Sequence, residues 1–374
     1  MGNYLKYRED AKKLFDSLTY PAWKRMGYTE YQEPVLTKLS SQPIIDSDIE
    51  LGELSDLTEQ QADAFYQGFQ EKQYGVNPKF VSLTESQSNF SKVYHFKKNQ
   101  VVENPIRLQF DLSSEETLAD EHLIYAETGA EATLILEYQA EEKGIQNASQ
   151  FHIGLIKVIA EENAHIKVFV IQTLPKSKVH IMNAVANCAR DAKVSFFSVS
   201  LGADVVASDY RSFLIGDNAA SDIEAVYLGE EENRLDLSYN IQHYGKCTDS
   251  YIEVNGALSG KAKKVFRGDL YFHRGSKAST GKEAEFVILL DEKVKADSIP
   301  ALFCDEDDVS GEHAANAGTV DENKLFYLMN RGFSETEAKK LIIRAAFSGV
   351  IDRLPLPDLM ERVEKNLEGK LLHV

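Results

Sequence analysis

Short segments with alternating hydrophobic residues recur through residues 130–310, and no stretch with helical spacing separates them. Alternation with a period of two is typical of a β-strand, because successive side chains point to opposite faces. The clearest of these segments are ATLILEY, HIKVFVIQTL, KVSFFSVSLG, IEAVYLG and LDLSYNIQHYG. This part of the chain is therefore predicted to be all β.

The spacing of these segments indicates a repeat. A small residue precedes each of them, at Ala130, Ala164, Ala192, Ala220 and Cys247, with separations of 34, 28, 28 and 27 residues. A period near 28 that holds two strand segments is typical of a solenoid coil, in which each strand stacks on its equivalent in the next coil. We predict a mainly β fold with a β-helix core. A β-sandwich with evenly spaced strands is the alternative.

Helical patterns flank the strand region. Residues 3–18 carry hydrophobic side chains at helical spacing, and Thr58 to Gln61 forms a capping box that begins a second helix. After Asp321 the pattern becomes helical again and ends at Gly332, a natural position for a C-terminal cap. A second capping box begins at Ser334. The hydrophobic stripe that follows it consists of Ala338, Leu341, Ile342 and Ala345.

These patterns divide the chain into three parts. Residues 1–105 form a partly helical region, residues 106–318 form the β-helix core, and residues 319–374 form a C-terminal helical domain. Helices at the end of a solenoid cover an edge that would otherwise accept another strand.

The formal net charge is −18, which disfavours binding to nucleic acid or to an anionic membrane. No segment approaches the ~20 apolar residues that a membrane helix needs. Cys188, Cys247 and Cys304 lie far apart, so neither a disulfide framework nor a structural zinc site is indicated. A soluble protein of the reducing cytoplasm fits best, with proteins or cations as partners.

Known catalytic motifs are missing. Gly275 to Glu283 resembles a phosphate-binding loop only superficially, because the glycine spacing is wrong and Glu283 stands where a hydroxyl should meet magnesium. We interpret it as a solenoid corner. The sequence has no GxSxG motif and no HExxH motif, although a Cys/His pair could still meet in the fold.

The acidic run at residues 305–308, followed by Glu312 and His313, offers ligands that iron or manganese accepts. The alternative is a solvated turn, and residue types alone favour that alternative.

Two long stretches carry a family resemblance. FRGDLYFHRGSKASTGKEAE and PALFCDEDDVSGEHAANAGTVDENKLFYLMNRGFSETEAKKLIIRAAF strongly resemble the SufB/SufD family of iron–sulfur cluster assembly proteins, in particular its SufD branch. The match runs from about Val265 to Phe347, and LFDSLTYPAWKRMGYTEY also resembles the SufD N-terminus. The resemblance implies a right-handed parallel β-helix.

The resemblance also implies a function. From the resemblance we expect a non-catalytic scaffold that pairs with a SufB-like subunit through the β-helix and binds a SufC-like ATPase through the C-terminal helices. No cofactor is expected on the isolated chain, and a transient iron–sulfur cluster is expected at the interface in the complex. His313 matches the family histidine near the cluster, Asp307 and Asp308 match an acidic pair, and Glu312 joins them at the interface.

The chain departs from the common SufD pattern at one possible sulfur ligand, because Gly311 stands where many SufD proteins have a cysteine. Cys304 is nine residues from His313, and an odd offset along an extended chain would put the two side chains on opposite faces. The ATPase contact is expected on the terminal helices, where an aromatic residue and an arginine are typical anchors. The residues assigned to it are Leu325, Phe326, Tyr327, Arg331, Gly332, Leu341 and Ile342.

Two other functions remain open. A SufB-like or self-pairing homologue would hold a cluster itself, and an isolated chain is expected to form a homodimer because its pairing face is unpartnered. An enzyme built on a β-helix would need a buried cleft with perturbed carboxylates.

Overall fold

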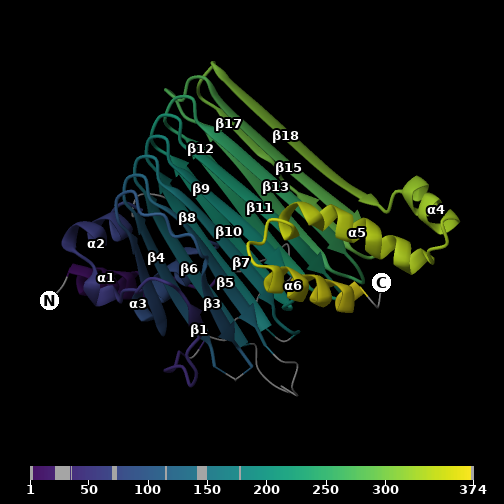
Figure 1. The fold of residues 1–374 in the computed structure, drawn as a ribbon, viewed down its shortest axis with the longest axis horizontal. Helices are drawn as coiled ribbons and strands as arrows, with labels where there is room; N and C mark the ends of the chain where they lie inside the picture. Colours follow the sequence, from purple (N-terminus) through teal and green to yellow (C-terminus); the bar gives the residue numbers. More distant parts are fainter. Residues whose placement is uncertain are drawn as a thin grey trace.

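The fold was determined as a computed structural model that describes residues 3–21, 34, 36–69, 74–113, 116–140, 150–176 and 178–371. It is a parallel β-solenoid of about 7 turns with helices at both ends of the chain, and it confirms the predicted fold class. Strands alternate between two sheets, so that one coil contributes one strand to each. Figure 1 shows the coils stacked in chain order.

Sheet 1 contains, in spatial order, β1 (Ile44–Asp46), β3 (Ile106–Asp111), β5 (Glu131–Gln139), β7 (His165–Thr173), β9 (Lys193–Ser200), β11 (Ala220–Gly229), β13 (Asp249–Leu258), β15 (Ser279–Leu289) and β18 (Val309–Thr319). Sheet 2 contains β2 (Phe90–Phe96), β4 (Leu118–Ala126), β6 (Gln150–Ala160), β8 (Lys178–Cys188), β10 (Val205–Leu214), β12 (Arg234–His243), β14 (Lys263–Phe272) and β16 (Lys295–Ser298), and β17 (Ala301–Cys304) also pairs with β14. Among the strands of the described residues, only β1 is antiparallel to its neighbour.

The stacking register corrects two of the predicted repeat positions. Because Lys193 pairs with Ala220 and Ala220 pairs with Asp249, the residues equivalent to Ala192 are Ala219 and Thr248. Ala219 and Thr248 are buried, whereas Cys247 is exposed in a corner with a left-handed φ of 55°. Corners of unequal length shift the small residue by one position, and residue type alone does not reveal this.

The solenoid interior is filled by the alternate side chains of both sheets, which form one hydrophobic cluster from Phe90 to Val287. The outer faces are partly covered as well, so many strands are buried on both sides. The helices α1 (Asn3–Ser17), α2 (Glu59–Tyr66) and α3 (Pro78–Gln87) pack on the outer face of sheet 2. The capping box at Thr58 is confirmed. Residues 22–31 of the SufD-like N-terminal segment lie outside the described residues.

Three helices follow the last strand: α4 (Glu322–Asn330), α5 (Glu335–Ile351) and α6 (Pro357–Lys370). The predicted stop at Gly332, with a φ of 97°, and the capping box at Ser334 are both confirmed. Figure 1 shows α5 and α6 lying across the solenoid and α4 standing beyond the edge of the sheet.

The face of α5 that packs on sheet 1 differs from the predicted stripe. It buries Ala338, Ile343, Phe347, Val350 and Ile351, and the last four pack with outer side chains of sheet 1 such as Phe169 and Phe197. Leu341 is exposed instead. The helix carries two adjacent hydrophobic stripes, and only the one that includes the bulky Phe347 faces the sheet.

The last helix returns toward the first coils. Arg362 on α6 donates to Glu137 of β5 at 2.6 Å, and Arg107 of β3 donates to Asp358 of α6 at 2.9 Å. Arg107 also donates to Glu137 through its Nε atom. Both Arg107 and Glu137 are buried, so these ion pairs link α6 to coils that precede it by more than two hundred residues.

The parallel strands extend from Phe90 to Thr319. The division of the chain after residues 105 and 318 remains a proposal. No helix among the described residues is long and apolar enough to cross a membrane.

Candidate functional site at the open end of the solenoid

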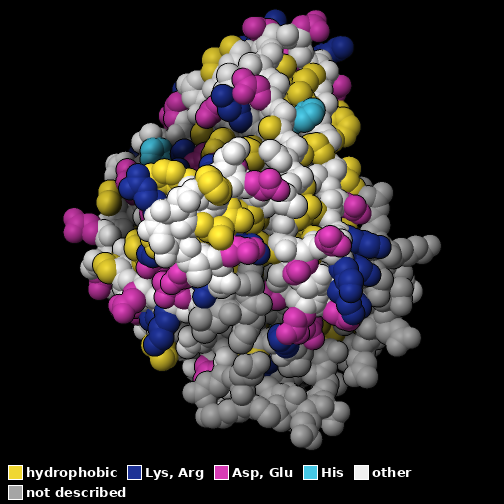
Figure 2. Space-filling view, turned by 90° about the vertical axis from the view of Figure 1, so that its right-hand side faces the viewer, with side chains coloured by type: hydrophobic (Ala, Val, Ile, Leu, Met, Phe, Trp, Pro, Cys, Tyr) yellow, Lys and Arg dark blue, Asp and Glu magenta, His cyan; other side chains and the backbone are white. Residues whose placement is uncertain are grey.

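The last coil presents an uncovered edge, contrary to the prediction that the terminal helices cover it, because α5 and α6 pack on the outer face of sheet 1 instead. In the described part of the chain, β18 pairs with β15 on one side and with no strand on the other. Most of its residues are exposed. An unpaired edge strand offers a row of backbone donors and acceptors to another chain. Figure 2 views the molecule from the side of α4 and β18, where hydrophobic side chains gather among charged ones.

His313 lies on this edge strand, in register with Glu283 of β15. Neighbouring residues in a parallel register point to the same face. Because Glu283 points into the solenoid, His313 lies on the same, inward face at the exposed edge. The predicted site histidine therefore has a buried carboxyl group as its neighbour in the preceding coil.

Glu283 has an unusual environment. Its side chain belongs to a residue that is 3% exposed, and neither carboxyl oxygen has a hydrogen-bond partner among the described residues. Burial, assisted by the nearby charges of Glu285 and Asp269, raises the pKa of Glu283 to about 8. By contrast, Glu285 lies 2.6 Å from the ammonium group of Lys264. At neutral pH Glu283 is mainly a protonated acid, which can give its proton to a base and then bind a cation as a carboxylate.

The acidic run forms the corner between β17 and β18. Asp305 accepts a hydrogen bond from the Tyr271 hydroxyl at 2.8 Å, and Glu306 accepts one from the backbone N–H of Gly275 at 2.9 Å. This backbone hydrogen bond lowers the pKa of Glu306. Asp307 and Asp308 are exposed. The first two carboxylates thus have a structural role in the corner.

Glu312 and His313 lie on opposite faces of β18, as their neighbouring positions predict. Glu312 pairs with Lys282 on the outside of the sheet at 3.2 Å. Within the described residues, no group of three or more His, Cys, Asp and Glu side chains is arranged to hold a metal ion. The roles of Asp307, Asp308, Glu312 and His313 therefore remain proposals.

The odd spacing between Cys304 and His313 does not put their side chains on opposite faces, because a corner separates the two residues. Cys304 lies in register with Phe272, whose side chain is buried inside the solenoid. Its side chain is therefore on the inward face, like that of His313. The two residues are nevertheless apart, since His313 is four residues, about 13 Å, along β18 from the corner. Cys304 is exposed at the end of β17.

The segment from Gly275 to Glu283 is a corner only at its beginning. Residues 274–278 form the turn, and β15 begins at Ser279. Sequence reasoning therefore missed Glu283 as a site residue. A polar residue at an inward position of a hydrophobic strand is the signal that could have identified it.

The terminal helices form a second surface. A cleft of about 860 Å³ lies between α4, α5 and the last strands of sheet 1, and its hydrophobic lining includes Phe286, Tyr327, Leu328, Leu341 and Ile342. All residues of α4 are described and none of them is buried; Phe326 is 69% exposed. The Arg331 guanidinium lies 5.1 Å from the centre of the Tyr327 ring. The structure thus leaves every residue predicted to contact the ATPase at least partly exposed.

We expect Glu283→Gln to change the pH dependence of stability. The folded state holds a proton on Glu283 between pH ~4.5 and pH ~8, whereas the unfolded chain releases it, so wild-type stability falls as pH rises through this window. At pH ~9 the variant should be more stable by about 2 kcal/mol, because it buries no unpaired charge. Urea unfolding at several pH values measures this difference.

The matched control is Glu312→Gln, which removes an exposed carboxylate from the neighbouring strand. It should leave the pH dependence unchanged. Equal behaviour of Glu283→Gln and wild type at alkaline pH would show that Glu283 is not held protonated by burial.

Together these features define a class of protein: a parallel β-solenoid with an open edge strand and a terminal helical hairpin that presents unburied aromatic residues. The family model for the SUF system FeS cluster assembly, SufBD core domain matches residues 106–346. The chain belongs to this SufBD family, as the sequence resemblance predicted.

The similar proteins agree with the family assignment. The chain is 28% identical over 295 residues to the iron–sulfur cluster assembly protein SufD of Bacillus subtilis. This match covers 78% of this chain and 67% of that protein. It is 22% identical over 371 residues to an iron–sulfur cluster assembly SufBD family protein of Staphylococcus saprophyticus, covering 97% of this chain and 79% of that protein. A SufBD family protein of Staphylococcus aureus gives the same identity and coverage. The chain is SufD-like, and these similarities support a role in iron–sulfur cluster assembly.

Proposed function

We propose that the chain is a non-catalytic scaffold subunit of a SufBCD-type iron–sulfur cluster assembly complex. It pairs with a SufB-like subunit through the edge of its β-helix and binds a SufC-like ATPase through α4 and α5. The observation that carries the proposal is α4, in which no residue is buried and whose Phe326 and Tyr327 side chains are 69% and 57% exposed. Exposed aromatics beside an arginine are typical of the anchors of a protein interface.

The exposed edge of β18 supports the pairing role. Its backbone groups can continue sheet 1 into a second chain, and the inward positions at this edge carry His313 next to Glu283. One imidazole and one carboxylate supply two ligands, whereas an iron–sulfur cluster takes about four. The nascent cluster, which is cargo of the complex, would therefore need ligands from the partner strand as well. This favours a site shared between two subunits.

A second candidate follows from the same pair of residues. A second copy of this chain could bring its own edge to β18 and hold the cluster in a homodimer. Anaerobic reconstitution of the chain alone distinguishes the two: bound iron and a visible absorbance band support the homodimer, and their absence without the SufB-like subunit supports the shared site.

We expect the double variant Phe326→Asp and Arg331→Glu to lose the ATPase. Phe326 would carry a charge into an apolar contact and Arg331 would reverse its charge, so the affinity for the SufC-like ATPase should fall at least about a hundredfold. Co-purification of the chain with the SufB-like and SufC-like proteins of the same source measures this loss. Pairing with the SufB-like subunit should remain.

The control for this experiment is His313→Ala. It should retain the SufC-like ATPase and impair cluster assembly in the complex, because His313 lies on the edge strand β18 and not on α4 or α5. Retention of the ATPase by the double variant would remove the hairpin from the proposal. Failure of wild type to bind either partner would contradict the scaffold function itself.

A further inference from the structure

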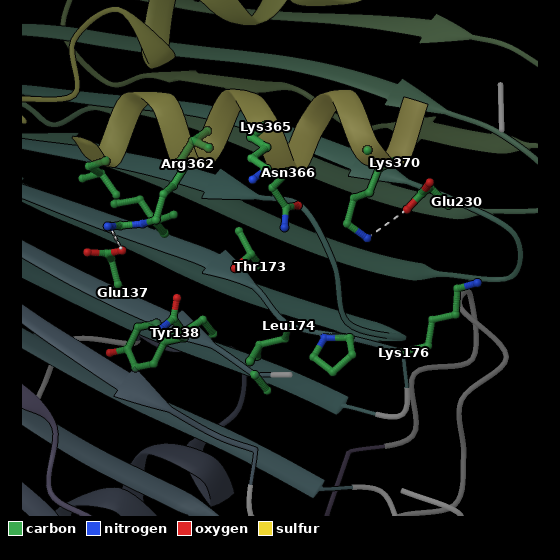
Figure 3. A pocket seen from close by; sticks show the side chains of 17 residues that line it. Glu137, Tyr138, Thr173, Leu174, Lys176, Glu230, Arg362, Lys365, Asn366 and Lys370 are labelled. Atoms are coloured by element: carbon green, nitrogen blue, oxygen red, sulfur yellow. Dashed lines mark hydrogen bonds and ion pairs between the residues drawn. The ribbon is translucent and has the colours of Figure 1, made fainter. Parts of the chain in front are cut away.

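A second cleft lies between α6 and the carboxyl ends of β5 and β7, on the face of sheet 1 away from the open end. Its volume is about 720 Å³, which is within the range of small-molecule sites. One wall is α6, and the floor includes Leu174 and the Tyr138 backbone region of β5. Figure 3 shows the polar side chains of α6 directed down into this cleft.

The charge of the cleft contrasts with that of the chain. Its lining has four basic side chains and two acidic ones: Lys176, Arg362, Lys365, Lys370, Glu137 and Glu230. The net charge of the chain is −18, so basic side chains outnumber acidic ones in this lining although they do not in the chain as a whole; Glu231 and Asp358, just outside the lining, pair with Lys176 and Arg362. Anions are concentrated at such a site because the field of the lining attracts them.

The charged residues of the lining other than Lys365 are already paired, and this includes Lys176, which lies 2.5 Å from Glu231. Glu137 accepts hydrogen bonds from Arg362 and from Arg107, and Glu230 lies 3.1 Å from the ammonium group of Lys370. Lys365 projects from the same face of α6 and forms no ion pair with any described residue. A lysine with no carboxylate partner at the mouth of a cleft is available to an anionic ligand.

Asn366 indicates that a ligand of this cleft carries a hydrogen-bond donor. Its side chain points from α6 into the cleft, toward Thr173 (Figure 3). The amide oxygen is buried, and among the described residues it has no hydrogen-bond partner. A buried acceptor without a donor costs free energy, so a ligand that brings an O–H or N–H group would remove this cost.

We propose that this cleft binds a phosphate-bearing small molecule that also carries hydroxyl or amino donors. The phosphate lies at Lys365, a donor of the ligand meets the Asn366 oxygen, and the apolar part of the ligand packs on Ala140 and Pro175, which are partly exposed. Lysines serve as point charges for phosphate, and hydrophobic walls with a few polar groups are typical of such sites. The ligand would join α6 to the strand ends that it faces.

Adenosine 5′-monophosphate is a suitable probe, because it has one phosphate, ribose hydroxyls and an amino group. Isothermal titration calorimetry with the full chain should show saturable binding of this probe and none of adenosine. Lys365→Glu should weaken the binding at least about tenfold, since it replaces the attraction for phosphate by repulsion. The matched control is Lys340→Glu, a partly exposed lysine of α5 outside the cleft, which should leave the affinity unchanged.

A second variant tests the hydrogen bond. Asn366→Leu should weaken the binding of adenosine monophosphate and leave that of inorganic pyrophosphate unchanged, because pyrophosphate lacks the hydroxyl and amino groups. Circular dichroism confirms that each variant is folded. The proposal is overturned if wild type shows no saturable binding of adenosine monophosphate at about millimolar concentration, or if Lys365→Glu binds it as tightly as wild type does.

Discussion

Replacement of Asp120 by alanine is expected to lower the free energy of unfolding by about 3–5 kcal/mol, the cost of breaking a buried ionic network. Asp120 is fully buried inside the first coils. Its carboxylate accepts hydrogen bonds from the Tyr138 hydroxyl at 2.6 Å and from Nε2 of His122 and of His152 at 2.8 Å each. The substitution leaves three buried donors without an acceptor, which is the main source of the cost.

The neighbours of Asp120 extend the network at both ends. Nδ1 of His152 lies 2.7 Å from Nδ1 of His180, and Nδ1 of His122 lies 2.8 Å from the Tyr94 hydroxyl. If each histidine is neutral and donates toward Asp120, every one of these contacts has one donor and one acceptor. The network is then complete only while the Asp120 carboxylate is ionised.

The expected loss for Asp120→Ala is measured by urea unfolding at pH ~7. Asp46→Ala, which removes an exposed aspartate of β1, is the control and should change stability by less than about 0.5 kcal/mol. A loss for Asp120→Ala as small as that of the control would mean that the three donors find other acceptors in the core.

The same network predicts loss of stability in acid. Burial alone would raise the pKa of Asp120, but His152 and His122 outweigh it and hold the pKa below its usual range. Burial, together with His152, lowers the pKa of His180. In both cases the unfolded chain binds more protons than the folded chain, so stability falls below pH ~6.5 through His180 and below pH ~4 through Asp120.

Phe347→Ala is expected to detach the terminal helices, at a cost of about 3–5 kcal/mol. Phe347 is fully buried between α5 and the outer face of sheet 1, in a cluster that includes Phe169, Phe197 and Val226. Removing its ring leaves a cavity at the centre of this contact. Limited proteolysis should then cut within α5 and α6 faster than in wild type, and thermal unfolding should begin at a lower temperature.

Phe326→Ala provides the same chemical change on the neighbouring helix. Because Phe326 is 69% exposed, this variant should be nearly as stable as wild type. If the two substitutions had equal effects on proteolysis, the hairpin would not be held by the cluster around Phe347. The pair also separates the fold of the hairpin from its proposed binding of the ATPase.

The fold could be predicted because both the period of the strands and the period of the coils are visible in the sequence. Alternation within strands identifies the sheets, and the recurrence of a small residue near every 28 positions identifies the coils. The register could not be predicted to the residue. Ala219 and Thr248 take the positions assigned to Ala220 and Cys247, since corner lengths change from coil to coil.

The candidate site was predictable only in part. His313 was identified through the family resemblance, but its neighbour Glu283 is thirty residues earlier, and only the stacking of coils brings the two into register. Cys304 was placed on the wrong face because the corner at residues 305–308 interrupts the strand. For α5, two hydrophobic stripes compete, and packing against Phe169 and Phe197 decides between them.

The contact of α6 with the first coils affects the order in which parts of the protein fold during translation. Neighbouring coils can pair soon after about thirty further residues leave the ribosome, so the solenoid can grow from its N-terminal side. The contact between Arg107 and Asp358, however, joins residues 251 positions apart. Until α6 is made, the buried Arg107 and Glu137 and the outer face of sheet 1 stay open to water. The earliest coils are thus the last to be sealed, and the nascent chain exposes a hydrophobic sheet face for most of its synthesis.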